Sequence, residues 1–253
     1  MAGGLAKQGM VPVVALYSTF LQRSYDQIIQ DVALLGLHVV FAIDRAGLVG
    51  EDGPTHHGVF DVGFLRQIPG MTVLCPTNFE ELRAMLRWAV NDCTGPVAVR
   101  YPRGNVCCGE TSRFTGDPST IFVEADSHNP VATVITYGTI AKEAKTAVQN
   151  LQKCGICVRL LLLNSVTHFS KDQLVQQVRG SHVFVVEEAC SNSGICDAIA
   201  MYLQESNTFC KVHSLDLGND FIPHGAMKSL YQRSGLDSDS ITEYISEVLR
   251  HED

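Results

Sequence analysis

The chain has 253 residues, of which 45% are hydrophobic and 18% charged, and its formal net charge is −8 at pH 7. The length is enough for one large or two small buried cores, and the acidic balance excludes the broad basic surface of a nucleic-acid-binding protein. No stretch approaches the ~18 consecutive apolar residues of a membrane span. The apolar run near the N-terminus leads into a helical pattern instead of a cleavage site, and the nine cysteines form no framework, so we expect a cytoplasmic protein.

Short apolar runs alternate with amphipathic segments from the first residues onward, which is typical of a parallel β-sheet covered by helices. A helix is especially clear after Thr77 and Glu80, which stand at the spacing of a capping box and are followed by apolar residues at helical intervals. The pattern predicts a first α/β domain over residues 1–115, with strands at 11–18, 39–44, 71–75 and 97–101.

The alternation stops in a stretch rich in Gly, Ser, Thr, Asp and Pro, and we expect a linker over residues 116–130. It then restarts and predicts a second α/β domain over residues 131–253, which ends in a helix capped by Ser240 and Glu243. The fold class is therefore α/β, with two consecutive parallel-sheet domains. The strands expected in the second domain cover 133–137, 158–163, 183–187 and 212–217.

Polar residues gather in three segments that follow strands, where open parallel sheets bind their ligands. These segments read YSTFLQRSYDQ from Tyr17, IDRAGLVGEDGPTHHGVFD from Ile43 and VRYPRGN from Val99. The second is unusually rich in Gly and Pro, which favours close contact with a ligand. It carries groups suited to phosphate binding and proton transfer, namely Arg45, Glu51, Asp52, His56 and His57. Composition alone leaves a solvated polar loop as an alternative.

The three strings, at these separations, resemble the pyrimidine-binding domain of the 1-deoxy-D-xylulose-5-phosphate synthase family. The resemblance continues less densely to the end of the chain, where the second domain is similar to the transketolase-like C-terminal domain of that family. It implies a thiamine-diphosphate-dependent transferase that condenses pyruvate with glyceraldehyde 3-phosphate, releases carbon dioxide and forms 1-deoxy-D-xylulose 5-phosphate. This product is a precursor of isoprenoids, thiamine and pyridoxal.

The resemblance also implies residue roles in the first domain. Phe20 is expected to stack on the aminopyrimidine ring of the cofactor, and Arg23 matches an active-site arginine whose role stays open. Tyr17, Arg45 and Arg103 match the pocket for the acceptor phosphate, a task that suits the planar fork of arginine.

Two further positions match the polar pair that closes over the bound pyruvate adduct, Asp52 and His56. His56 is the expected proton carrier, because the pKa of free imidazole lies near neutral pH. His57 is expected to be structural or exposed to solvent, since neighbours on an extended loop point in different directions. The segment from Ala189 to Cys196 departs from the glycine-rich turn of the family, which leaves its packing open.

The family's activating glutamate would lie before Met1, and its site for the cofactor diphosphate and Mg²⁺ belongs to an N-terminal domain. We therefore expect thiamine diphosphate and Mg²⁺ to be held mainly by that domain, and the isolated chain to be inactive. Three hypotheses follow: one half of a synthase that works with an N-terminal half or as a homodimer, a non-catalytic pseudoenzyme or assembly module, and a β-type subunit of another thiamine-diphosphate enzyme.

Overall fold

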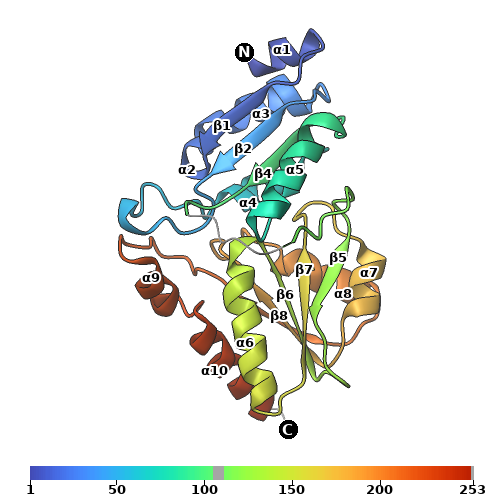
Figure 1. Ribbon diagram of the computed structural model, residues 1–253, viewed down its shortest axis with the longest axis vertical. Helices are drawn as coiled ribbons and strands as arrows, with labels where there is room; N and C mark the ends of the chain where they lie inside the picture. The colour runs from blue at the N-terminus through green and yellow to red at the C-terminus, as the bar shows by residue number, and fades with distance from the viewer. Residues whose placement is uncertain (105–110, 252–253) are drawn as a thin grey trace.

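The computed structural model of the chain describes residues 1–104 and 111–251 and consists of two α/β units placed end to end along its long axis (Figure 1). The N-terminus lies at the far end of the first unit and the C-terminus at the far end of the second. Within these residues, no helix is long and apolar enough to cross a bilayer.

The first unit is built on a four-stranded parallel sheet in the order β1-β2-β4-β3. Its strands are β1 (Val13–Tyr17), β2 (Val40–Asp44), β3 (Thr72–Leu74) and β4 (Val97–Arg100), so all four predicted strands are confirmed. β4 is buried throughout because it lies inside the sheet, whereas β1 forms an edge. The helical segments of this unit are α1 (Ala2–Lys7), α2 (Ser18–Leu21), η1 (Gln22–Ser24), α3 (Tyr25–Ile28), η2 (Ile29–Ala33), η3 (Gly50–Asp52), α4 (Asp61–Arg66) and α5 (Phe79–Asn91).

The start of α5 corrects the predicted capping box by one residue. Asn78 is the N-cap, and its side chain accepts a hydrogen bond from the backbone N–H of Glu81 at 2.9 Å. The Glu81 carboxylate in turn accepts from the backbone and hydroxyl of Thr77, at 2.9 and 2.7 Å. The pairing of Thr77 with Glu80 was therefore wrong, because the Thr77 hydroxyl is a donor to Glu81 and not the cap of the helix.

The second unit contains a five-stranded sheet in the order β5-β7-β6-β8-β9. Its four predicted strands appear as β6 (Ala132–Tyr137), β7 (Val158–Leu163), β8 (His182–Val186) and β9 (Lys211–Leu215), all parallel. The helical segments are η4 (Gly138–Ile140), α6 (Ala141–Lys153), α7 (Lys171–Gln177), α8 (Cys196–Glu205), α9 (Met227–Arg233) and α10 (Ser238–Arg250). Asp237 caps α10 by accepting from the N–H groups of Asp239 and Ser240 at 3.2 Å, so the predicted cap at Ser240 and Glu243 was also wrong.

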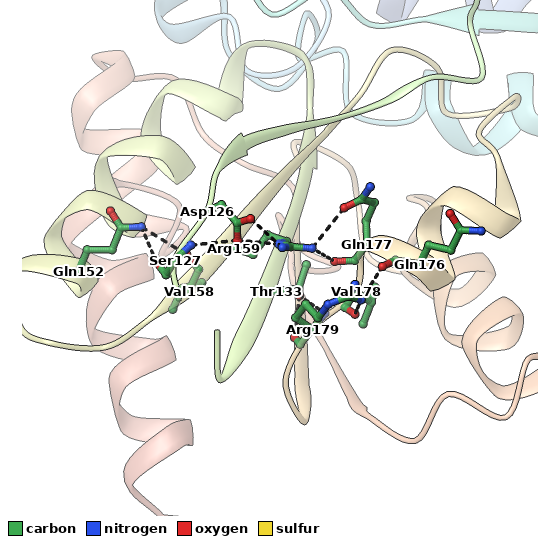
Figure 2. Close-up of polar contacts among 10 residues, drawn as sticks. All are labelled: Asp126, Ser127, Thr133, Gln152, Val158, Arg159, Gln176, Gln177, Val178 and Arg179. Carbon is green, nitrogen blue, oxygen red and sulfur yellow. Dashed lines mark hydrogen bonds and ion pairs between the residues drawn. The ribbon is translucent and has the colours of Figure 1, made fainter. Parts of the chain in front are cut away.

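A fifth strand, β5 (Ile121–Ala125), occupies residues that we expected in the linker. It runs antiparallel to β7 at one edge of the sheet, so the second sheet is not purely parallel. Figure 2 shows how the end of this strand is fixed: the guanidinium of Arg159 on β7 donates to both carboxylate oxygens of Asp126, at 2.9 and 2.7 Å. The same guanidinium donates to the carbonyl of Gln177 at 2.8 Å, which ties the edge strand to the end of α7.

The carboxyl ends of both sheets meet between the units. Backbone hydrogen bonds cross this junction from Cys75 N to Asn164 O at 2.8 Å, from Val166 N to Val73 O at 3.1 Å and from Gly138 N to Cys75 O at 3.3 Å. One continuous cluster of buried apolar side chains also includes residues of both units. The loops after the strands of the first sheet therefore lie against the second unit.

Candidate functional site

The residues selected from the sequence lie together at the carboxyl ends of β1, β2 and β4. Tyr17 ends β1 and Phe20 lies in α2, whereas Arg45 follows β2 and Arg103 follows β4. The connection of residues 45–58, here called the site loop, runs from Arg45 past η3 to Gly58. The order of the parallel sheet brings the loops after β1, β2 and β4 to one edge.

Aromatic rings form one side of the candidate site. The rings of Tyr17 and Phe20 are stacked with centroids 5.5 Å apart, and the ring of His56 meets Phe20 edge-on at 5.3 Å. The guanidinium of Arg23 lies 5.7 Å from the centroid of the Phe20 ring. Phe20 is only partly buried, so it sits among these three side chains with part of its surface free to contact a ligand.

Two arginines and a carboxylate lie next to these rings. The guanidinium of Arg45 lies 3.7 Å from the centroid of the Tyr17 ring, and its Nε lies 3.8 Å from the Asp52 carboxylate. Nη1 of Arg103 contacts the same Asp52 oxygen at 2.7 Å. We expected Asp52 to act beside His56. The Asp52 carboxylate contacts both arginines, where it neutralises part of their charge, and its role beside His56 stays a prediction.

The backbone at Arg45 is held in an uncommon conformation. Its φ is 59°, in the left-handed region that non-glycine residues seldom adopt. The Arg45 N–H donates to the Asp44 carboxylate at 2.7 Å, and the Ala46 N–H donates to Tyr101 O at 3.0 Å. Among the described residues, the buried Nε of Arg45 has no hydrogen-bond partner. A buried donor of this kind is costly, and an anionic oxygen would satisfy it.

A cavity of about 530 Å³ opens beside this cluster, between the two units. Its apolar lining includes Phe79, Leu82 and Leu162, and Lys142 and Thr139 reach it from the second unit. The charged residues that line it are mostly basic: Arg45, Arg103, Arg113, Lys142 and Lys145 against Asp44 and Glu124. Such a cavity suits a small anionic ligand.

His57 is a structural residue of the site loop, in keeping with one of the two expectations for it. It is 3% exposed. Its Nδ1 accepts from the Val49 N–H at 3.1 Å, and its Nε2 lies 3.2 Å from Pro223 O, to which it must donate because a carbonyl only accepts. Burial lowers the pKa of His57, which favours this neutral form. The side chain therefore joins the site loop to the second unit.

Further contacts between the site loop and the second unit were not visible in the sequence. Gly225 N donates to Gly50 O at 3.2 Å, and Leu48 N donates to the buried carboxylate of Glu188 at 3.1 Å. The segment whose packing the sequence left open also reaches the first unit, because Cys190 N donates to Val59 O at 3.0 Å. The second unit thus forms the base on which the site loop lies.

The described residues fit one part of thiamine diphosphate better than the other. The partly exposed ring of Phe20 suits stacking on an aminopyrimidine, and the buried hydroxyl of Ser18 nearby has no hydrogen-bond partner in the described part of the chain. No group of three or more His, Cys, Asp or Glu residues in that part is arranged to hold a metal ion.

Comparisons with known proteins match the two structural units of the chain separately. Residues 1–108 match the family described as transketolase, pyrimidine binding domain, and residues 123–241 match transketolase, C-terminal domain. Among curated proteins, 1-deoxy-D-xylulose-5-phosphate synthases of Chlorobium luteolum and Chlorobium phaeovibrioides are each 42% identical to the chain, over 98% and 96% of its length. The chain spans 40% and 39% of those two proteins.

Solved structures show the same fold at lower identity. A chain titled split gene transketolase, inactive beta4 tetramer, superposes with a TM-score of 0.85 at 24% identity, over 98% of this chain and 79% of that one. A transketolase from Campylobacter jejuni superposes with a TM-score of 0.79 at 19% identity, over 97% of this chain and 37% of that one.

Proposed function

The chain belongs to the transketolase family, as the counterpart of the C-terminal part of 1-deoxy-D-xylulose-5-phosphate synthases, and from this premise we propose that it forms the pyrimidine-binding and acceptor-binding part of such an enzyme. The proposed reaction condenses pyruvate with glyceraldehyde 3-phosphate to 1-deoxy-D-xylulose 5-phosphate and carbon dioxide, in the cytoplasm. Thiamine diphosphate, when bound, supplies the carbanion chemistry for this reaction. Its diphosphate, Mg²⁺ and activating glutamate are assigned to an N-terminal domain, on the same polypeptide or in a partner chain, and the assembly can also be a homodimer.

The observation that carries this proposal is the contact of Arg45 and Arg103 with one carboxylate beside the basic cavity. Arg103 donates to one oxygen of this carboxylate at 2.7 Å, and Nε of Arg45, which has no hydrogen-bond partner among the residues that the structure describes, faces the same oxygen at 3.8 Å. The two guanidinium groups together therefore suit a phosphate, which prefers paired, charge-assisted hydrogen bonds. In this proposal, a phosphate oxygen of the acceptor takes the position that the Asp52 carboxylate has in this structure. Binding of the acceptor therefore requires the Asp52 side chain to move away from the two arginines.

His56 is the proposed proton carrier. Thr55 Oγ1 and His56 Nδ1 lie 2.9 Å apart, and the ring packs edge-on against Phe20, so the imidazole is oriented from two sides. We assign to its Nε2 the transfer of a proton to the carbonyl oxygen of the acceptor as that oxygen becomes a hydroxyl. A positioned general acid of this kind contributes roughly 10²–10⁴-fold in rate.

The test uses the full chain reconstituted with an N-terminal domain of the family. Arg45→Ala and Arg103→Ala are expected to raise mainly the KM for glyceraldehyde 3-phosphate, at a cost of about 2–4 kcal/mol, because the bound phosphate desolvates both side chains. His56→Ala is expected to lower kcat by roughly 10²–10⁴ with a smaller change in KM. Arg83→Ala, on the exposed face of α5, is the matched control and should change neither.

Three other outcomes would redirect the proposal. Unchanged kinetics in all three site variants would refute the site assignment and leave family membership intact. A complex that forms and holds cofactor but shows no turnover would identify the chain as a non-catalytic assembly module. Turnover only with a different 2-oxoacid and acceptor would identify it as a β-type subunit of another thiamine-diphosphate enzyme.

A further inference from the structure

We propose that Glu188, in the second unit, is a positioning residue that fixes the site loop of the first unit in the shape that presents Arg45, Asp52 and His56. Its significance for catalysis rests on the proposed function. The physical part of the proposal, that Glu188 holds the loop, stands on contacts within this chain and can be tested without any reaction.

Glu188 lies just beyond the end of β8, is 5% exposed and receives hydrogen bonds from three separate segments. The Tyr231 hydroxyl on α9 donates to its carboxylate at 3.1 Å, and the Thr139 hydroxyl in η4 donates at 3.4 Å. Both donors belong to the second unit, so they orient the carboxylate from its own side. The third donor is the Leu48 N–H of the site loop, at 3.1 Å. The loop is thus attached to an acceptor that the second unit has already oriented.

Gly47 shows how closely the site loop approaches this carboxylate. Its φ is +76°, and a Cβ atom at this position would lie only 2.7 Å from Oε1 and 2.8 Å from Cδ of Glu188. A glycine is required here for both reasons, because an L side chain would be strained by the backbone and would overlap the carboxylate. The backbone of the loop therefore lies directly on Glu188.

This attachment point controls both ends of the site loop. Gly47 and Gly58 exchange two backbone hydrogen bonds of 2.8 Å, which close the base of the loop. Arg45 lies two residues before Gly47, and Asp52 and His56 lie between the two glycines. Fixing Gly47 and Leu48 on Glu188 therefore fixes the frame from which all three site residues project.

Burial of Glu188 is unfavourable for its ionised form, and burial raises the pKa of this carboxyl group. An apolar side chain would avoid that cost but would leave Leu48 N, Tyr231 Oη and Thr139 Oγ1 without this acceptor. A carboxylate at this position is explained by its bonds, and the bond to Leu48 is the one that crosses between the units.

Hydrogen exchange on the full chain, followed by mass spectrometry, tests the attachment. Glu188→Ala is expected to raise the exchange rate of peptides that cover residues 46–53 at least tenfold, because the Leu48 N–H loses its acceptor. Glu188→Gln keeps an acceptor oxygen and should stay within about threefold of the unchanged protein. Glu143→Ala is the matched control, because the Glu143 carboxylate accepts from the Ser238 N–H at 2.9 Å inside the second unit. This control should raise exchange at the start of α10 only.

A second variant reaches the same contact from the loop side and covers the case in which Glu188→Ala fails to fold. Gly47→Ala retains Glu188 but pushes the loop off the carboxylate, so it should produce the same local rise in exchange over residues 46–53. The proposal is overturned if exchange in the site loop stays unchanged in both variants, or if it rises equally throughout the second unit.

Kinetics separate this proposal from the proposed function. In the reconstituted enzyme, we expect Glu188→Ala to lower kcat and raise the acceptor KM by about tenfold each, and Glu188→Gln to restore both. If exchange rises locally but the kinetics of an active enzyme stay unchanged, only the catalytic significance of Glu188 is overturned, and the attachment of the loop stands. An inactive reconstituted enzyme in which the rise in exchange persists would contradict the proposed function and support the attachment.

Discussion

Replacement of Arg100 by methionine is expected to be among the most destabilising single changes in the first unit. Arg100 ends β4 and is 5% exposed, and the Asp61 carboxylate that it contacts is fully buried. Nε of Arg100 donates to Asp61 Oδ2 at 3.1 Å and Nη2 donates to Oδ1 at 3.0 Å. In Arg100→Met, the Asp61 carboxylate stays buried and keeps the Val62 N–H, at 3.0 Å, as a hydrogen-bond donor, but it loses its counter-charge.

The expected size of the effect follows from this geometry. Removal of one member of a buried ion pair costs about 3–5 kcal/mol, because the remaining charge has neither water nor a partner. A whole protein is usually stable by only about 5–15 kcal/mol. Asp61→Asn removes the stranded charge and still provides an acceptor for the Val62 N–H, so the double variant Arg100→Met/Asp61→Asn should recover at least half of the loss.

Urea denaturation provides the measurement, and the only tryptophan of the chain reports on the first unit. Trp88 lies on α5 and packs edge-on against Phe114 with ring centroids 5.9 Å apart, so its fluorescence should change when α5 unfolds. Arg83→Met is the control, because Arg83 is 61% exposed and its replacement should change the free energy of unfolding by less than about 0.5 kcal/mol. A loss below about 1 kcal/mol in Arg100→Met, or a double variant no more stable than the single one, would refute the reasoning.

The remaining predictions concern thiols, pH, the edge strand and cofactor binding. Burial raises the pKa of Cys75 to about 12, so native protein treated with iodoacetamide at pH 8 should be modified at the exposed Cys154 long before Cys75; equal rates by mass spectrometry would contradict this. Burial also raises the pKa of Glu187 in the folded protein. This group therefore stabilises the folded state below the pKa of a glutamate in the unfolded chain, about 4.3. The stabilisation is lost as the pH rises through the higher pKa that Glu187 has in the folded state. The melting temperature of Glu187→Gln minus that of the unchanged protein should therefore increase with pH over this range and then level off. A difference that stays constant from pH 4 to 8 would disprove the raised pKa of Glu187. Arg159→Ala should cost about 1 kcal/mol, because the Asp126 partner is half exposed and the bond to the Gln177 carbonyl is only partly buried. Faster hydrogen exchange in β5 is the accompanying signature, and its absence would argue against the anchoring role. Calorimetric titration of the chain alone with thiamine diphosphate and Mg²⁺ should show weak binding or none, because the proposed function assigns the diphosphate and Mg²⁺ to an N-terminal domain, and sub-micromolar affinity would overturn that expectation.

The sequence was sufficient for most of the fold, and the errors have local causes. Long apolar runs located the strands of both sheets, because buried parallel strands need side chains that are apolar on both faces. Strand β5 was missed because an edge strand needs no such run, and its residues stand in a polar stretch. The cap of α5 was misplaced by one residue because Thr77 and Asn78 both suit an N-cap and Glu80 and Glu81 both suit the third position. Only the three-dimensional contacts distinguish these registers.

The candidate site also has one part that could be predicted from the sequence and one part that could not. Convergence of the loops after β1, β2 and β4 could be expected, since the carboxyl ends of parallel strands share one edge. The contact of Asp52 with Arg103 joins residues that are 51 positions apart, and that of Leu48 with Glu188 joins residues 140 positions apart. Neither follows from a periodicity or a short motif. The first contact becomes visible only when the loops after β2 and β4 are folded together, and the second only when both units are placed against each other.

The apolar cluster that continues from one sheet into the other has a consequence for how this chain can be divided or recombined. Cys75, Tyr137 and Leu163 are almost fully buried where the sheets meet, so either unit produced without the other would turn part of this surface toward water. Exposed apolar surface of that kind promotes aggregation. Chimeras that exchange the two units together should therefore remain soluble more often than chimeras joined between β4 and β5. The pair is expected to be inherited, and best engineered, as one indivisible block.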